Sequence, residues 1–398
     1  MRKAKRRRGK LQISGMLQRK GNPQGGTGHG ACWSDSDGPQ SKFIKYDAES
    51  VEDFIKDGLQ FFESVFRVRR SVVSLACTAD GMHMVCSGTV VDHVDEKTWI
   101  LTSASLVRKP DTLFEAYEPC DVKIQVALHN KQIVEGSLEM CNLHYNIAIV
   151  TIESPGSRIN LPTVELSDLP ECYSLQPRPV VALGRDMYSK GFQMRCGELV
   201  RRNSELDCTE LLTCTCDVSG NFIGGPVMDS ERRFLGITFR YEETTPFLPV
   251  EIAARCLKYY KKSKTLPRVR IRGQALHMLS MNSLEHLCCK YAKPPHGILV
   301  QEICEISAEK CGGVVVGDII SELDGITLYS AAQFTAMLLD KMEVASNPQN
   351  TLTLQAVVRR PTDQTIFVAK LNVQDIASDE CEGSFQNKWI WWKELWFP

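Results

Sequence analysis

The sequence predicts a mostly β protein built as two units, an antiparallel barrel or sandwich followed by a smaller, partly open β unit with one or two helices. Short apolar or alternating runs follow one another over residues 71–239, separated by Gly, Pro, Asn and Asp, with no regular helix between them. Similar runs recur after residue 267, together with one helical pattern. The 398 residues suffice for two or three domains of about 150 residues each.

Residues 1–50 are predicted to form a basic, Gly-rich, disordered tail. The first twenty residues hold nine Lys or Arg and no acid, whereas the rest of the chain has 38 basic against 48 acidic residues. The tail carries few large apolar side chains, so burial cannot repay the entropy of ordering it. Any nucleic-acid binding is therefore expected from this tail and not from the acidic body of the protein.

A dense basic cluster in the tail is typical of nuclear import signals and of segments that contact phosphates. The cluster consists of Arg2, Lys3, Lys5, Arg6, Arg7, Arg8 and Lys10. A solvated basic terminus is the simpler interpretation. The expected localisation is the nucleus or the cytoplasm, with a plastid or mitochondrion as the alternative.

The first folded unit is expected over residues 51–264. Apolar residues at spacings of three and four predict an amphipathic helix over 51–66. Seven strand-like runs follow, at 71–76, 84–91, 98–102, 122–128, 147–152, 180–183 and 234–239. The charged run 258–264 is interpreted as a linker or as the end of a connecting helix.

The second unit is expected over residues 265–375 and is followed by a Trp-rich tail over 376–398. Strand-like runs occur at 297–303, 318–323, 351–358 and 365–373, and a helix is predicted over 330–341. The tail holds four of the six tryptophans. Because exposed aromatic clusters of this size are rare, we expect the tail to dock onto the protein or to bind something.

The sixteen cysteines are interpreted as reduced thiols, because they are dilute in a chain of this length and no apolar signal segment follows the basic terminus. No run approaches the ~20 apolar residues of a membrane span, so an intracellular, soluble protein is expected. Cys208, Cys214 and Cys216 lack a second CxxC or a paired His, and the adjacent pair Cys288 and Cys289 is poorly placed to chelate one ion. No metal and no cofactor is expected.

Four segments resemble motifs of trypsin-like serine proteases, in particular of the HtrA (DegP) family. Gly220-Asn-Phe-Ile-Gly-Gly-Pro226 is similar to the family's Gly-Asn-Ser-Gly-Gly-Pro nucleophile loop. Segment 99–107 resembles the strand and turn that carry the general base, and 146–152 resembles the strand that carries the orienting acid. Segment 84–91 resembles the strand before the histidine. The resemblance implies a double six-stranded β-barrel followed by a PDZ-like α+β domain.

Each motif keeps its scaffold and lacks its reactive residue. Ser105 stands where the family has histidine, Asn146 where it has aspartate, and Ile223 where it has serine. A hydroxyl attacks only when an imidazole removes its proton, and that imidazole needs a carboxylate to orient it. Losing one member commonly costs about 10⁴ to 10⁶ in rate. The three substitutions therefore argue against ordinary proteolysis.

The loop at Ile223 is also one residue longer than the family pattern, because Phe222 and Ile223 together stand where the family has serine alone. An oxyanion hole requires backbone amides about 3 Å from the developing charge. The added residue is expected to misplace those amides.

A relocated catalytic set is conceivable from Ser219 and His144, with Asp217 as the orienting acid. Ser219 lies four positions before Ile223, and His144 shares a face with Asn146 if both lie on one strand. The simpler interpretation, which we favour, is that Ser219 makes a turn hydrogen bond and His144 lies at a strand end. New triads require sub-ångström placement.

The second unit resembles a PDZ domain of the HtrA type, through segments 297–303, 307–313 and 316–325. PDZ domains add a peptide as a strand and capture its carboxylate with the amides of an apolar-Gly loop. The corresponding loop here is Arg270-Ile271-Arg272-Gly273, and the helix with Phe334 forms the other wall. Phe334 and its neighbours can also be interpreted as core residues, and we favour this interpretation.

Three functions follow from the sequence. The first is a non-catalytic HtrA-like scaffold or regulator that binds peptides or proteins through the PDZ-like groove and the former substrate cleft. The second is an active serine endopeptidase using non-standard residues. The third is nucleic-acid binding by the basic tail. By analogy with the family, the chain is also expected to form a homotrimer or a heterotrimer, and no membrane partner is expected.

Overall fold

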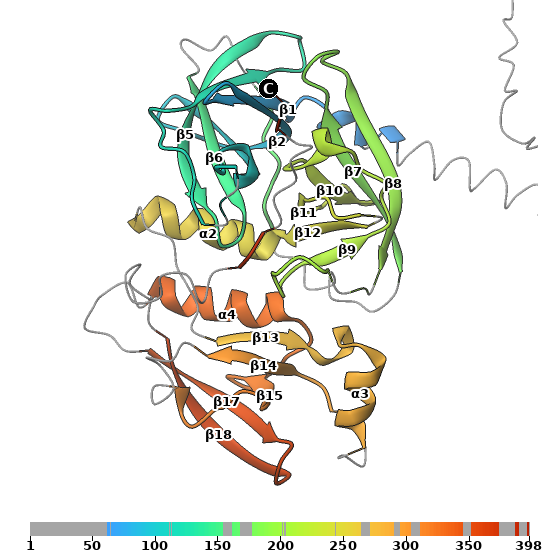
Figure 1. Ribbon diagram of the computed structural model, residues 1–398, viewed down its shortest axis with the longest axis vertical. Helices are drawn as coiled ribbons and strands as arrows, with labels where there is room; N and C mark the ends of the chain where they lie inside the picture. Colours follow the sequence, from blue (N-terminus) through green and yellow to red (C-terminus); the bar gives the residue numbers. More distant parts are fainter. Residues whose placement is uncertain are drawn as a thin grey trace, which may run out of the picture. The chain divides into compact units, whose positions relative to one another are not determined.

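The computed structural model (Figure 1) describes most of the chain from residue 62 onward. The described residues are 62–63, 65–110, 112, 114–153, 161–167, 177–200, 202, 204–242, 244–263, 271–289, 295–303, 311–344, 352–373, 387–389 and 396–397. The predicted tail 1–50 lies outside this part of the chain. Of the predicted helix over 51–66, residues 62, 63, 65 and 66 are described, and these are helical.

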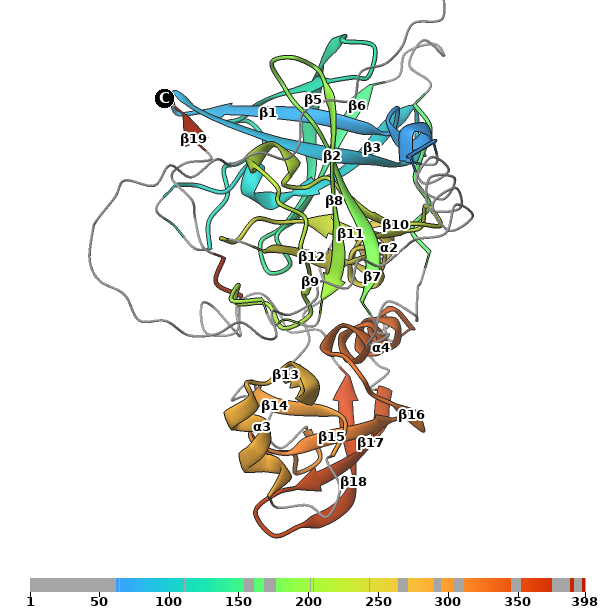
Figure 2. The ribbon, with the colours of Figure 1, turned by 90° about the vertical axis from the view of Figure 1, so that its right-hand side faces the viewer.

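The first barrel, which we call barrel 1, has six strands in the order β1-β4-β5-β6-β3-β2 and is closed by pairing between β1 and β2. The strands are β1 (Val72–Ala79), β2 (Met82–Val94), β3 (Lys97–Ser103), β4 (Lys123–Ala127), β5 (Ile133–Asn142) and β6 (Ile147–Glu153). A seventh strand, β19 (Trp396–Phe397), adds to the outer edge of β2, as Figure 2 shows. Strands such as β6 are apolar and buried along almost their whole length, because both of their faces are covered.

The second barrel, barrel 2, is closed in the order β10-β11-β12-β9-β8-β7. Its strands are β7 (Arg178–Arg185), β8 (Phe192–Val200), β9 (Leu212–Cys214), β10 (Pro226–Asp229), β11 (Phe234–Thr238) and β12 (Thr245–Pro249). Helix α2 (Val250–Ser263) follows β12 directly. It contains most of the charged run 258–264, which was interpreted as a linker or as the end of a connecting helix. Two closed six-stranded barrels confirm the predicted fold class.

A third sheet follows the barrels, with strand order β13-β14-β15-β17-β18 and β16 paired to β15. Its elements are β13 (Ile271–Ala275), α3 (Met281–Cys288), β14 (Ile298–Ile303), β15 (Ile319–Leu323), β16 (Ile326–Thr327), α4 (Ala331–Val344), β17 (Leu352–Arg360) and β18 (Thr365–Val373). This arrangement is consistent with a PDZ-like domain. The predicted helix over 330–341 corresponds to α4, whereas the sequence pattern did not reveal α3.

The strand predictions were correct where apolar runs are long and incomplete elsewhere. Strands β5, β8, β9, β10 and β12 had no counterpart among the predicted runs. In β5 and β8 exposed and partly buried residues dominate, so their apolar signal is weak. Strands β9, β10 and β12 have only three to five residues each. Their short length explains why periodicity alone did not separate them from loops.

Candidate functional site

Ser105 and Asn146, which were expected at the positions of a protease base and acid, are in direct contact. Ser105 lies in the 3₁₀ turn η1 (Ala104–Leu106) after β3, and its amide donates to the Ser103 hydroxyl at 3.1 Å. Asn146 ends the turn between β5 and β6 with a φ of 53°, a left-handed conformation that Asn tolerates. The Asn146 amide donates to Ser105 Oγ at 3.0 Å, and Ser105 Oγ lies 3.4 Å from Asn146 Oδ1.

Arg108 joins this pair from the buried side. Its guanidinium donates to Asn146 Oδ1 and to the carbonyl oxygen of Leu143, both at 3.2 Å, and the residue is only 1% exposed. Burial lowers the pKa of Arg108 to about 10, although the nearby Cys141 thiol acts in the opposite direction. The pair therefore belongs to a network with a buried cation. Sequence reasoning missed Arg108, because no pattern marks a single Arg as buried.

Ile223, at the nucleophile position, is a core residue. It follows the 3₁₀ turn η4 (Gly220–Phe222), is 3% exposed and packs in the apolar core of barrel 1. The next residue, Gly224, has a φ of 79°, and a Cβ there would lie 2.5 Å from the carbonyl oxygen of Ser87. Glycine is required at this position by both conformation and space. This turn therefore places an aliphatic side chain in the core of barrel 1.

Four consecutive backbone amides of this turn are bonded to carbonyl oxygens of the protein. They are Phe222 to Ser219 at 3.0 Å, Ile223 to Gly220 at 3.1 Å, Gly224 to Thr238 at 2.9 Å and Gly225 to Phe222 at 2.8 Å. An oxyanion hole needs amide hydrogens that point at the position of the developing charge. These four amides are already used, so the turn does not present them to a substrate carbonyl.

Ser87, on β2 of barrel 1, forms hydrogen bonds both with the turn that carries Ile223 and with β7 of barrel 2. Its amide donates to the carbonyl oxygen of Ile223 at 2.8 Å, and its hydroxyl donates to the carbonyl oxygen of Asn221 at 2.6 Å. The same hydroxyl accepts from the amide of Arg185, on β7 of barrel 2, at 2.9 Å. Ser87 is fully buried. The turn is therefore held by hydrogen bonds that span 134 residues of sequence.

The residues of the conceivable relocated set have other partners. Ser219 is exposed, and its hydroxyl donates to the side-chain oxygen of Asn221 within the same turn. His144 Nδ1 accepts from the amide of Asn387 at 3.2 Å. Asp217 is exposed. His144 and Asn146 lie in the turn over 143–146 and not on a strand, so the expectation that they share a strand face is wrong.

The predicted peptide-capture loop is a strand in the structure. Ile271, Arg272 and Gly273 belong to β13, which pairs with β14 through a bulge between Arg272 and Gly273, and Arg270 lies outside the described residues. Strand β13 forms the edge of the described third sheet. Phe334 on α4 is 1% exposed and belongs to the apolar core.

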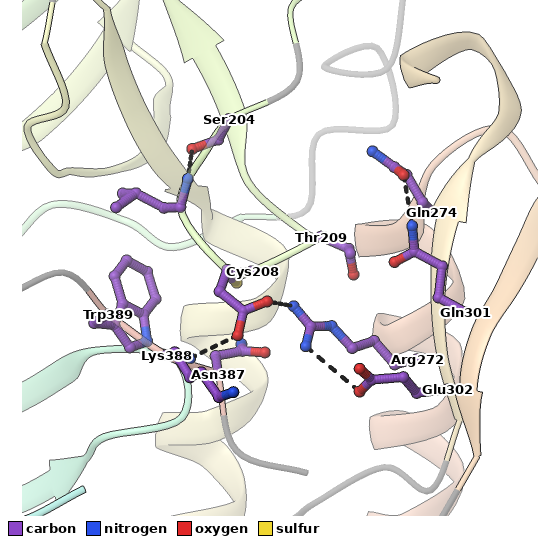
Figure 3. Close-up of polar contacts among 12 residues, drawn as sticks. Ser204, Cys208, Thr209, Arg272, Gln274, Gln301, Glu302, Asn387, Lys388 and Trp389 are labelled. Atoms are coloured by element: carbon purple, nitrogen blue, oxygen red, sulfur yellow. Dashed lines mark hydrogen bonds and ion pairs between the residues drawn. The ribbon is translucent and has the colours of Figure 1, made fainter. Parts of the chain in front are cut away.

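Arg272 is held by carboxylates on two sides, as Figure 3 shows. It forms an ion pair with Asp207, from the segment before β9, and lies 3.6 Å from Glu302 of β14. Glu210 of the same segment accepts a hydrogen bond from Thr335 of α4 at 2.8 Å. The segment that contains Asp207 and Glu210 thus contacts both β13 and α4.

The described cysteines form no disulfide bond, and no group of three or more His, Cys, Asp or Glu in the described ranges is arranged to hold a metal ion. Among the same residues, no helix is both long and apolar enough to cross a bilayer.

Comparison with known proteins agrees with this geometry. Residues 86–237 match the sequence profile of the trypsin-like peptidase domain. The structure is similar to that of the HtrA-type protease AlgW with a tripeptide, with a TM-score of 0.50, 16% identity, and coverage of 80% of this chain and 98% of that one. No curated protein sequence matches.

Two further solved structures are similar at lower scores. A substituted form of AlgW with a tripeptide has a TM-score of 0.49 at 16% identity, covering 79% of this chain and 98% of the other. A serine endoprotease from Yersinia pestis has a TM-score of 0.44 at 17% identity, covering 80% and 98%.

Two six-stranded barrels, with the three motif positions in the turns described above, define a trypsin-like peptidase fold. Residues 86–237 match the trypsin-like peptidase domain, and the chain has the fold of HtrA-type proteases.

Proposed function

We propose that this chain is a non-catalytic HtrA-like pseudoprotease that acts as a peptide-binding or protein-binding scaffold or regulator. The contact between Ser105 and Asn146 carries the proposal. Where the fold needs an imidazole oriented by a carboxylate, the chain has a hydroxyl and an amide beside the buried guanidinium of Arg108. Neither Ser105 nor Asn146 accepts a proton near neutral pH, so no general base acts at this place.

The state of the nucleophile turn supports the same proposal. Ile223 has no nucleophilic atom, and its own amide is bonded to Gly220. Removing one oxyanion-hole donor typically costs about 10² to 10³ in turnover. This loss adds to the missing triad, because transition-state stabilisation is absent as well as proton transfer.

The test is turnover of an unfolded, fluorescently labelled casein by the full chain and by Ser219→Ala and His144→Ala. We expect cleavage by all three to equal the background of buffer alone, while the labelled casein or a peptide library still binds. Cleavage that either substitution abolishes would instead show an active endopeptidase with a relocated site. Cleavage equal in all three preparations points to a contaminating protease, which a serine-protease inhibitor titration identifies.

Peptide binding by the third domain is proposed along the edge of β13, beside α4, in the manner of a PDZ-like domain. The described β13 residues Ile271, Gln274 and Ala275 are buried, and Arg272 is paired with Asp207. A peptide that adds to this edge therefore has to displace the segment that contains Asp207. The substitution Asp207→Ala is expected to increase peptide binding at this edge, and unchanged binding would contradict this part of the proposal.

The basic tail over 1–50 is proposed as the localisation signal or nucleic-acid contact of the protein. Its test is binding of a DNA duplex over a range of salt concentrations, with and without residues 1–20. Binding that decreases steeply with salt and disappears with the deletion supports the nucleic-acid role. The proposed trimer is tested by the mass of the full chain in solution.

A further inference from the structure

Three residues of the Trp-rich tail, Asn387, Lys388 and Trp389, are docked on the barrels. Asn387 is 1% exposed and Trp389 is 3% exposed, which places both among the most buried residues of their types in the described structure. Asn is mostly exposed in proteins, and a buried amide is costly unless it is hydrogen-bonded. The docking therefore involves specific polar contacts as well as apolar burial.

The polar contacts of Asn387 and Trp389 converge on one residue, His144. The backbone amide of Asn387 donates to His144 Nδ1 at 3.2 Å. The Asn387 side-chain amide donates to the carbonyl oxygen of His144 at 3.0 Å, and the indole N–H of Trp389 donates to the same oxygen at 2.9 Å. Both side chains thus contribute a donor that few other side chains would place in the same position.

Barrel 2 supplies the remaining contacts. The indole of Trp389 packs on the ring of Phe239, which follows β11, with centroids 4.7 Å apart and ring planes at 54°. The backbone amide of Lys388 donates to Asp207 at 2.9 Å, and Asp207 also pairs with Arg272. Because this hydrogen bond uses the backbone amide, any residue except proline can form it.

The three receptor residues, His144, Asp207 and Phe239, define what we call the tail site. His144 comes from the turn between β5 and β6 of barrel 1, two residues before Asn146. Asp207 and Phe239 come from barrel 2, before β9 and after β11. The tail site therefore joins the two barrels. Its His144 lies in the same turn as Asn146. The chain meets barrel 1 again at β19, which pairs with β2 through Trp396 and Phe397.

We propose that the tail site is a peptide-recognition site for extended segments with the sequence Asn-Xaa-Trp, and that residues 387–389 are its internal ligand. The site reads an Asn amide, the backbone amide of the next residue and an indole, each through a contact described above. The proposal deepens the scaffold function by naming a ligand class. The biological role of the tail site rests on the proposed scaffold function. The contacts themselves do not, because they form whether or not the chain cleaves peptides.

An internal ligand sets the condition under which a second peptide binds. A tethered segment has an effective concentration in the millimolar range, so a peptide with the same contacts competes poorly while the tail is in place. Emptying the site by substitution in the tail removes this competition. Increased binding of an external peptide after loss of the internal contacts distinguishes a ligand from a merely structural anchor.

The experiment measures fluorescence anisotropy of a labelled peptide with the sequence of residues 384–390, added to the full chain. The proteins are the wild type, the double variant Asn387→Ala/Trp389→Ala, and Tyr188→Ala, whose side chain is 77% exposed and serves as the matched aromatic control. We expect the double variant to bind the peptide about tenfold more tightly, or better, than the wild type and the control. A peptide with Ala in place of the Trp should bind none of the three.

Equal affinity of the wild type and the double variant, or equal binding of the two peptides, would overturn the proposal. If circular dichroism shows that the double variant is unfolded, Trp389→Phe replaces it. This variant keeps an aromatic ring beside Phe239 but removes the indole N–H and one of the two fused rings. A smaller gain in peptide affinity is therefore expected, and no gain overturns the assignment. The wild type could instead form a dimer that the tail substitutions dissociate. That result would confirm the tail site but overturn the proposal that residues 387–389 occupy the tail site of their own chain. Casein cleavage that Ser219→Ala or His144→Ala abolishes would refute the pseudoprotease function and leave the anisotropy result unaffected.

Discussion

The side-chain amide of Asn146 donates to the hydroxyl oxygen of Ser105 at 3.0 Å. The two positions that an HtrA-like protease fills with acid and base thus remain in contact, although neither residue transfers a proton near neutral pH. The turns that carry the two residues belong to the scaffold of barrel 1, so the fold determines the contact. Proton transfer would depend instead on the identity of the two side chains.

The first prediction concerns the triple variant Ser105→His, Asn146→Asp, Ile223→Ser, which restores the family's three reactive residues. We expect casein turnover to remain at background. The amides from Phe222 to Gly225 stay bonded to carbonyl oxygens, so no oxyanion hole forms even with a triad in place. The measurement is release of fluorescence from labelled casein, with circular dichroism as the control for folding. Turnover well above the wild-type value would contradict this prediction and show that the bonded amides do not prevent catalysis.

The second prediction concerns Ser87→Ala, which removes the hydroxyl that joins the nucleophile turn to barrel 2. The carbonyl oxygen of Asn221 and the amide of Arg185 lose a buried partner. We expect the free energy of unfolding to decrease by about 1–3 kcal/mol for the groups left unsatisfied.

Urea denaturation followed by circular dichroism measures this loss. Ser74→Ala is the matched control, because Ser74 is equally buried but its hydroxyl makes a single, longer bond, of 3.3 Å, to the carbonyl oxygen of Cys86. The control should lose less stability than Ser87→Ala. Equal losses would mean that the bridge adds nothing beyond a buried hydroxyl.

The third prediction concerns pH and Asp207. Burial alone would raise the pKa of Asp207. Hydrogen bonds from the Arg272 side chain and the Lys388 backbone amide, together with the positive charges of the Arg272 and Lys388 side chains, outweigh burial and hold the pKa below its usual range. A carboxyl group with a lowered folded-state pKa contributes stability above its unfolded value of about 3.9, and this contribution is lost as the pH falls through the folded-state pKa.

Asp207→Asn should therefore be less stable than the wild type at pH 7, and the difference should shrink as the pH falls below about 4. Urea denaturation at several pH values measures it. The control is Asp95→Asn, an exposed turn residue, which should not show this pH-dependent difference. A difference for Asp207→Asn that is constant with pH would contradict the role of its charge.

The fourth prediction concerns the order in which thiols react. Burial raises the pKa of Cys77, Cys86 and Cys256 to about 12. At pH 8 a thiol with that pKa is ionised to only ~10⁻⁴, and the thiolate is the reactive form. Cys120 and Cys289 are exposed.

Iodoacetamide at pH 8 should therefore modify Cys120 and Cys289 first, whereas the three buried thiols should react only after unfolding. Peptide mass spectrometry after short and long labelling measures the order, and labelling in urea is the control for intrinsic reactivity. Early modification of Cys256 would show that the protein opens locally near α2.

Prediction from the sequence succeeded where the information is local. The long apolar runs of β1, β3 and β6 and the helical pattern of α4 appear at nearly their observed positions. Segment 99–107, expected to form a strand and a turn, includes most of β3 and all of η1, and segment 146–152 includes most of β6. Asn146, however, lies in the turn before β6 and not on the strand. Short strands such as β9, with three residues, were missed because so few residues do not establish a period.

Prediction failed where a residue acts through a distant partner. Arg108 contacts Asn146 across 38 residues, Ser87 contacts Asn221 across 134, and Asn387 contacts His144 across 243. In each pair, the sequence around one residue does not indicate its distant partner. The tail was expected either to dock or to bind something, and the structure shows docking of residues 387–389, with His144 as their common acceptor.

The sequence by itself determined that the chain forms two β-rich units and that Ser105, Asn146 and Ile223 stand in the segments that resemble the protease motifs. Alternation of apolar residues and side-chain identity are properties of short segments. Only the tertiary structure decided that the amides of the nucleophile turn are already bonded and that Asn387 and Trp389 lie on His144. The physical reason is that buried polar groups must find hydrogen-bond partners. Those partners are chosen by proximity in the folded chain, which the local pattern does not encode.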